Sequence, residues 1–246
     1  MTGVLTESSI ASSVVRLALS EGAEVLLTAP LCRAHSLTSR VGPRLGVTAP
    51  VIELDVSLSE DLDLLTDRVR AAGWERVDGV LHAIVYAPEA AAGSTVADLG
   101  WEDVATTLQA STWSLAALVH ALAPLLTRGG SVVGLDFDGS RVWPGFGWLG
   151  IAKAGLESCA RYLAHELGPA GIRVNLVSAG PLPTLGARGI PGFEAVAGGW
   201  DDRAPLGWGP ADVGAVAQAA VVLLSDWFPK TTGDIVHVDG GAHTRG

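Results

Sequence analysis

The segment from Phe146 to Lys153 holds the residues most able to carry chemistry. Lys153 is one of only two lysines in the chain and lies in a mostly apolar stretch, where a solvated charge is out of place. A lysine there can bind the hydroxyl or phosphate groups of a cofactor, or it can have a structural role. Phe146, seven positions earlier, is aromatic but lacks the hydroxyl that would move a proton or stabilise a charge. This spacing suggests a reaction without identifying it.

The rest of the chain predicts the scaffold that positions these residues. Short, nearly continuous apolar runs are typical of strands buried on both faces of a parallel sheet. They span residues 24–28, 51–56, 77–85, 131–137, 173–178 and 234–238. Amphipathic segments of helical length alternate with them, at 9–20, 62–72, 104–126, 148–167 and 212–224. The alternation predicts an α/β fold, a Rossmann-like doubly wound parallel sheet, with one domain over residues 1–246.

Composition excludes several classes of partner. A net charge of −10 without a basic run argues against nucleic acid and against an anionic membrane surface. No apolar stretch reaches about 18 residues and the first residues lack a signal-peptide pattern, so we expect a cytoplasmic protein with no membrane partner. Cys32 and Cys159 follow no metal-ligand spacing, so we expect no metal and two reduced, structural thiols.

Ligands of such sheets bind at the carboxyl ends of the strands, and polar or glycine-containing turns lie at these ends. The helix after Gly3, with Ser9 near its start, can hold a pyrophosphate, or it is a plain Ser-capped helix. Asp55 can accept a hydrogen bond from an adenine amino group or cap a turn. Gly180 before Pro181 can let the backbone approach a flat ring or simply turn the chain. The long irregular stretch 179–208 is expected to cover the site.

Several motifs resemble, in order and spacing, one known family. They are TGVLTESSIA (2–11), ELDV (53–56), GLDFD (134–138), AKAGLES (152–158), NLVSAGP (175–181), DDRAP (201–205), LLSDW (223–227) and DGGAHT (239–244). Together they are similar to the NADH-dependent enoyl-acyl carrier protein reductases of type II fatty acid synthesis, members of the short-chain dehydrogenase/reductase superfamily. The similarity runs from residue 2 to residue 244.

The resemblance implies NADH-dependent reduction of trans-2-enoyl thioesters of acyl carrier protein or coenzyme A, by a homotetramer. Arg33 keeps NADPH possible. The implied catalytic positions are Lys153, Phe146 at the tyrosine position and Phe137. The implied cofactor-binding residues are Gly3, Val4, Ser9, Ile10, Asp55, Val56, Ala83, Ile84, Lys153, Ala179, Gly180, Pro181, Leu182 and Thr184. The implied substrate pocket contains Tyr86, Trp143, Ile190 and Phe193.

The spacing before the lysine distinguishes two classes within the superfamily. A ketoreductase or alcohol dehydrogenase would have tyrosine four positions before the lysine, where this chain has Leu149. The enoyl reductase pattern places tyrosine seven positions before it, where this chain has Phe146. The resemblance therefore implies enoyl reduction at an impaired rate, with Tyr86 as a candidate substitute donor. A non-catalytic cofactor-binding relative, or a partner subunit of an active reductase, is the alternative.

Two further departures from the family pattern concern cofactor binding and stability. Val85 stands where the pattern has a glycine, so a β-branched side chain is expected to crowd the cofactor. The chain also has only Met1 and Thr2 ahead of Gly3, where the pattern has a whole strand. We expect the first strand to be largely missing and Met1 to be a misassigned start preceded by strand-like sequence.

Overall fold

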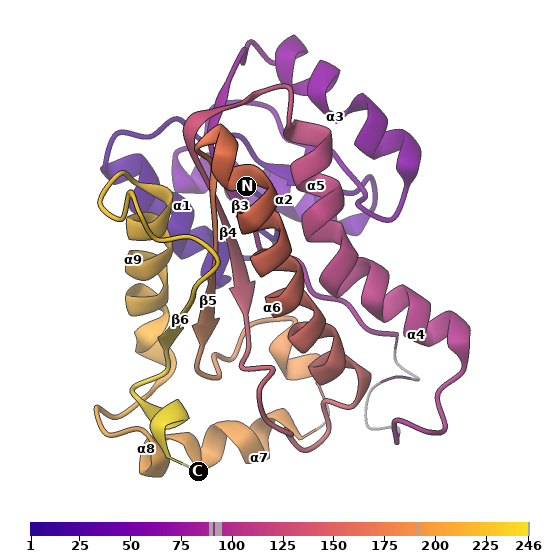
Figure 1. Cartoon of the computed structure of the whole chain (residues 1–246), viewed down its shortest axis with the longest axis vertical. Helices are drawn as coiled ribbons and strands as arrows, with labels where there is room; N and C mark the ends of the chain where they lie inside the picture. The colour runs from indigo at the N-terminus through magenta and orange to yellow at the C-terminus, as the bar shows by residue number, and fades with distance from the viewer. Residues whose placement is uncertain (89–90, 92–94, 191, 246) are drawn as a thin grey trace.

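The computed structural model describes residues 1–88, 91, 95–190 and 192–245, and its strands lie between two layers of helices (Figure 1). The strands are β1 (Thr28–Ala29), β2 (Ile52–Glu53), β3 (Val77–His82), β4 (Leu126–Asp136), β5 (Arg173–Ala179) and β6 (Ile235–Val238). The helices are α1 (Ile10–Ser20), α2 (Arg33–Leu45), α3 (Ser59–Ala71), α4 (Trp101–Leu108), α5 (Ser114–Leu122), α6 (Trp148–Leu167), α7 (Phe193–Gly198), α8 (Trp200–Arg203) and α9 (Val213–Leu224). The α/β fold with parallel strands is confirmed.

The strands form two parallel sheets, β1-β2 and β3-β4-β5-β6. Successive side chains of a strand point to opposite faces, so neighbouring apolar residues enter different cores. Val132 of β4 packs in the core with α3, α5 and α6, whereas Val133 packs in the core with α1 and α9. Both faces of the larger sheet are thus buried, which explains why its strands read as continuous apolar runs.

The first two residues bridge the two sheets. The Met1 amino group donates to the Leu26 carbonyl and the Thr28 N–H donates to the Met1 carbonyl, as a parallel strand residue opposite Leu27 would arrange them. On the other side, the Thr2 N–H donates to the Leu81 carbonyl. Met1 and Thr2 therefore take the place of the end of a strand between β1 and β3.

Behind Met1, a small cavity of about 70 Å³ continues between the two sheets. Its lining includes Val25, Leu26, Val77 and Val80, together with Leu65 of α3. No strand among the described residues separates residues 24–26 from β3, so the predicted strand 24–28 shrinks to Thr28–Ala29. Regular pairing fails there because a parallel strand needs a neighbour to complete its ladder.

In protein expressed from Met1, whose amino group is free, burial of that group in this gap makes folding sensitive to pH. Burial lowers the pKa of the amine from 8.0 to about 5. The unfolded chain therefore holds a proton that the folded chain releases between pH 5 and pH 8, and stability rises with pH across that window. At pH 6 the two-unit difference from 8.0 costs roughly 3 kcal/mol of the free energy of unfolding.

We predict that an apolar extension of about five residues ahead of Met1, rich in Val and Ile, raises the melting temperature by at least about 5 °C. The added strand would fill the gap and replace the buried amine by a peptide N–H, so the gain should be larger at pH 6 than at pH 8. Calorimetric melting at both pH values measures it. A Gly/Ser extension of equal length is the control, and equal gains from both extensions would contradict this account.

The predicted helix 104–126 is wrong in its continuity. The segment contains α4, a π-helical turn (Gln109–Trp113), α5 and the start of β4. Ser111 of the π-helical turn hydrogen-bonds the backbone of Tyr86 in the loop after β3, and Oγ of Ser114, the first residue of α5, lies 2.8 Å from Nε2 of His82 at the end of β3. Among the described residues, no helix is long and apolar enough to span a membrane.

Candidate cofactor and substrate site

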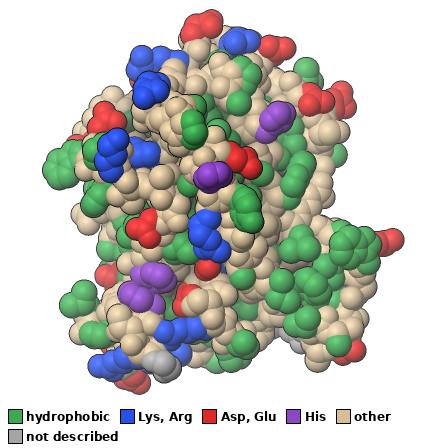
Figure 2. Space-filling view, in the orientation of Figure 1, with side chains coloured by type: hydrophobic (Ala, Val, Ile, Leu, Met, Phe, Trp, Pro, Cys, Tyr) green, Lys and Arg blue, Asp and Glu red, His purple; other side chains and the backbone are tan. Residues whose placement is uncertain are grey.

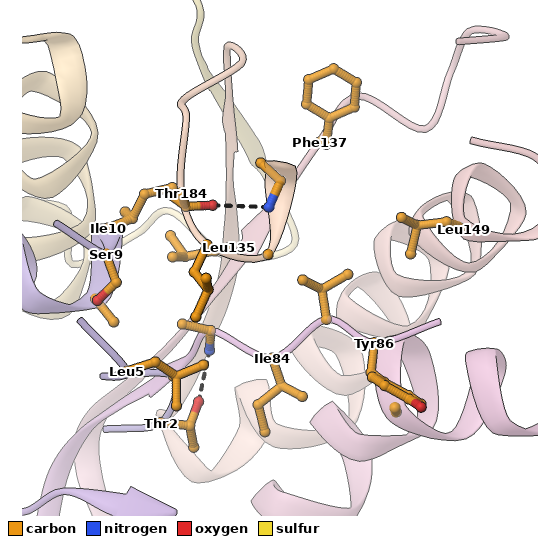
Figure 3. Close-up of a pocket in the computed structure, with 18 of the residues that line it drawn as sticks. Thr2, Leu5, Ser9, Ile10, Ile84, Tyr86, Leu135, Phe137, Leu149 and Thr184 are labelled. Carbon is orange, nitrogen blue, oxygen red and sulfur yellow. Dashed lines mark hydrogen bonds between the residues drawn. The ribbon is translucent and has the colours of Figure 1, made fainter. Parts of the chain in front are cut away.

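A cavity of about 590 Å³ opens at the carboxyl ends of β1 to β5, where the sequence places the candidate residues. Most of those residues line it, and Figure 3 shows several of them converging from the loop before α1, from the strand ends and from α6. The lining includes Gly3, Ser9, Ile10, Asp55, Val56, Ala83, Ile84, Tyr86, Phe137, Phe146, Lys153, Ala179, Gly180, Pro181, Leu182, Thr184, Ile190 and Phe193.

Gly3 brings the loop before α1 against the end of β3. Its φ is +77°, and a Cβ at this position would lie 2.1 Å from the Ala83 carbonyl oxygen, so a side chain is excluded. Thr2 fixes the same contact, because its Oγ1 accepts a hydrogen bond from the Ala83 N–H at 2.8 Å. The loop thus runs along the cavity wall with its backbone exposed to a ligand.

The helix α1 begins at this wall with Ser9 as its N-cap. The Ser9 Oγ accepts from the Ser12 N–H and donates to the Thr6 carbonyl. These contacts belong to a Ser-capped helix start, and the same end of the helix offers positive dipole to an anion in the cavity. Both readings of this segment are therefore compatible with the geometry.

Asp55 is committed in part to a local turn. Its Oδ1 accepts hydrogen bonds from the Ser57 N–H at 2.9 Å and from Ser57 Oγ at 2.6 Å. Val56 follows it in the cavity lining, together with Ser57. Asp55 thus caps a local turn. It also lines the cavity, where a ligand can reach it.

Lys153 projects from α6 to the floor of the cavity. Its Nζ donates to the Leu135 carbonyl at 2.9 Å and lies 3.9 Å from Oδ1 of Asp136. Its side chain is 8% exposed. Burial lowers the pKa of Lys153, whereas the neighbouring Asp136 and Glu157 carboxylates raise it. The lysine is thus a buried cation whose charge depends on its acidic neighbours.

Aromatic rings form the adjoining wall. The Phe146 ring stacks on Phe137, with centroids 4.9 Å apart and planes 19° from parallel. Phe137 also packs against Trp143 and Trp200. Phe146 is buried and lines the cavity. A hydroxyl added to its ring would therefore place a hydrogen-bond donor in the cavity wall.

Tyr86 lies at the cavity edge rather than beside Phe146. Its side chain is 56% exposed. Figure 3 shows its ring directed away from Phe137. This arrangement does not favour Tyr86 as a substitute donor.

The segment after β5 covers the cavity from the other side. Gly180 is packed against Trp208, because a Cβ there would lie 2.5 Å from the indole ring. The indole Nε1 donates to the Pro181 carbonyl at 2.9 Å and fixes this turn. Further along, Thr184 accepts from the Ala187 N–H and, like Ile190 and Phe193, reaches the lining. The irregular stretch contains the short helices α7 and α8.

Two predicted site residues lie outside the lining. Val4 is fully buried in the core beside α1, and its carbonyl accepts from Thr38 Oγ1. Trp143 packs behind Phe137, with its Nε1 donating to the Asp138 carbonyl. Conversely, Asp136 lines the cavity although the sequence analysis assigned it no role beyond its place in the GLDFD motif. Its position at the end of β4, next to Phe137, was the available signal.

The chain is similar to known proteins over almost its whole length. Residues 3–243 match the family model described as Enoyl-(Acyl carrier protein) reductase. A relative named Enoyl-[acyl-carrier-protein] reductase [NADH], from Mycolicibacterium smegmatis, is 40% identical, with 100% of this chain and 95% of the relative covered. Similarly named relatives are 36% identical in Aquifex aeolicus (100% and 91% covered) and 31% identical in Escherichia coli (98% and 92% covered). With the motifs, the cavity and these relatives in agreement, the chain belongs to the enoyl-acyl carrier protein reductase family.

Proposed function

We propose that this protein uses NADH to reduce trans-2-enoyl thioesters of acyl carrier protein or coenzyme A to acyl thioesters, at a rate limited by Phe146. The observation that carries the proposal is Lys153 at the floor of a large, mainly apolar cavity, seven positions after an aromatic residue that lines the same cavity. The relatives' names support the cofactor and the carrier-protein substrate.

The residues present fit a nicotinamide dinucleotide. The side-chain-free backbone at Gly3 and the N-terminal end of α1 would receive the pyrophosphate. Asp55 and Val56 would face the adenine, and Lys153 would hold the ribose hydroxyls beside the nicotinamide. β1 ends without a carboxylate, at Ala29, so nothing there discriminates between NADH and NADPH, and both cofactors should be titrated.

When bound, NADH supplies a hydride to the β-carbon of the enoyl thioester. The protein has to place the acyl chain against the apolar wall, exclude water and stabilise the negative charge that develops on the thioester oxygen. Phe146 orders the wall through its stacking on Phe137 but offers that oxygen no hydrogen bond. Loss of one such donor typically costs on the order of 10²–10³ in rate, so slow turnover is expected rather than none.

The missing hydroxyl also favours the alternative of a non-catalytic cofactor-binding relative or partner subunit. Mixing the protein with NADH and a short trans-2-enoyl thioester separates the two functions. Saturable NADH binding with slow, thioester-dependent NADH oxidation supports the reductase. Tight NADH binding without oxidation, even at high protein concentration, supports the alternative.

We further propose that the protein assembles as a homotetramer. Apolar side chains gather over the α4 region, at the lower right of Figure 2, and Trp101 of α4 is 74% exposed. Trp113 and Tyr162 on neighbouring helical segments are also exposed. Such surfaces support self-association, and sedimentation measures its stoichiometry.

Replacing Val85 by glycine is predicted to lower the dissociation constant for NADH about threefold, or about 0.7 kcal/mol. Val85 and Gly186 both line the cavity, and a Cβ built on Gly186 would lie 3.9 Å from the Val85 Cγ1, so the Val85 side chain narrows the cavity proposed for the cofactor. Fluorescence titration measures the change. Val142→Gly, at a residue that is 96% exposed, is the control. Unchanged or weaker NADH binding by a stable Val85→Gly protein would show that Val85 does not crowd the site.

A further inference from the structure

Asp136 is a buried carboxylate whose hydrogen bonds are not made. It is the last residue of β4, its side chain is 0% exposed, and neither of its oxygens has a hydrogen-bond partner among the described residues. The nearest cation is Lys153, whose Nζ lies 3.9 Å from Oδ1. A buried carboxylate without donors is costly, so this residue needs an explanation.

The other ionisable groups around Asp136 have partners of their own, although Nδ1 of His82 has none among the described residues. On α6, Glu157 accepts from the Gly139 N–H at 2.8 Å. In the loop after β4, Asp138 accepts from Ser140 and pairs with Arg141. On β3, Nε2 of His82 lies 2.8 Å from Ser114 Oγ, which itself donates to the Ala110 carbonyl. Lys153 is therefore the counterion on which Asp136 depends.

The electrostatics of this cluster put the pair close to a change of charge. Burial raises the pKa of Asp136 to about 7; the Lys153 ammonium and the Phe137 backbone N–H lower this pKa, whereas Glu157 and Asp138 raise it. Burial in turn lowers the pKa of Lys153, which the Asp136 carboxylate and then Glu157 raise. Burial and the Lys153 charge lower the pKa of His82 to about 3, so His82 is neutral and does not compete.

We propose that Asp136 is a positioning residue that keeps the Lys153 ammonium charged and at the cavity floor, and thereby sets the pH range over which NADH binds. The proposal rests on the proposed function, because it assigns Lys153 to the cofactor. Lys153 is held from two directions, by the Leu135 carbonyl and by Asp136, and only Asp136 carries a formal charge. The Asp136 carboxylate has no hydrogen-bond donor among the described residues, so it favours the charged ammonium of Lys153 over the neutral amine.

The test is the pH dependence of the NADH dissociation constant for Asp136→Asn, which preserves shape and removes the charge. Loss of the carboxylate leaves only Glu157 to oppose the lowering of the Lys153 pKa by burial, so the pH at which NADH affinity is lost should fall by at least one unit. In a Lys153→Met background the same substitution should not shift the pH profile. Asp78→Asn, at an exposed carboxylate on β3, is the matched control.

A midpoint unchanged by Asp136→Asn, even with weaker binding at every pH, would overturn the proposal, since a purely structural role predicts that result. A second measurement needs neither variant nor cofactor. The chain has two lysines, so ¹³C labelling of lysine gives two assignable side-chain signals in nuclear magnetic resonance. The chemical shift of Lys153 should change in two steps, one of them near neutral pH as Asp136 titrates. A single step at alkaline pH would overturn the proposal. Failure of the native protein to bind NADH at any pH would instead contradict the proposed function.

Discussion

Phe146→Tyr should raise the turnover number for trans-2-enoyl thioester reduction at least tenfold, with an upper range on the order of 10²–10³. The Phe146 ring already lines the cavity and is held by stacking on Phe137, so the substitution adds a hydroxyl to an ordered wall. That hydroxyl would donate to the thioester oxygen as negative charge develops on it. The interaction forms mainly in the transition state, so kcat should rise more than KM falls.

The measurement is steady-state NADH oxidation with saturating cofactor and a short enoyl thioester. Phe228→Tyr adds the same hydroxyl at a half-exposed position outside the cavity lining and should leave turnover unchanged. A Phe146→Tyr protein that folds and binds NADH normally but turns over no faster would show that Phe146 is not what limits the rate.

Lys153→Met is expected to weaken NADH binding by one to two orders of magnitude and to lower kcat/KM by at least about a hundredfold. Methionine keeps the length of the buried stem but removes the charge and all three donors. Loss of charge-assisted hydrogen bonds to cofactor hydroxyls costs about 1.5–3 kcal/mol each, which accounts for the size of the effect. Asp136 would then lose its counterion and take up a proton, because burial already raises its pKa to about 7.

Lys230→Met is the matched control, because Lys230 is the only other lysine and is exposed. NADH fluorescence titration and melting temperature should be measured together for both variants. Equal NADH affinity in the native and Lys153→Met proteins would remove Lys153 from the cofactor site, whatever the effect on turnover.

The parts of the fold that local pattern controls could be predicted from the sequence. The amphipathic segment 148–167 coincides with α6, because its helical periodicity gives one apolar face to bury. The continuous apolar run 173–178 lies within β5, because that strand is buried on both faces. The helix α2 was not predicted, since it contains Gly42 and Pro43, which local propensity disfavours. Tertiary packing of Val41 and Leu45 stabilises it nevertheless.

The site shows the same division. Strand-end position predicted that Gly3, Asp55 and the residues after β5 lie at one edge of the sheet, and they line one cavity there, which Lys153 reaches from α6. Two properties depended on side-chain packing and could not be predicted. One is the orientation of Tyr86 away from Phe137, and the other is the approach of Asp136 to Lys153 at 3.9 Å across 17 positions of chain.

The measurement that tests the central claim most directly is transfer of label from NADH to the acyl chain. The native protein, at high concentration, is incubated with NADH deuterated at C4 on both faces and with a short trans-2-enoyl thioester, and the product is analysed by mass spectrometry. The account predicts a saturated thioester carrying one deuterium at its β-carbon, formed slowly by the native protein and faster by Phe146→Tyr. Bound NADH without any labelled saturated product from either protein would contradict enoyl reduction as the function of this chain.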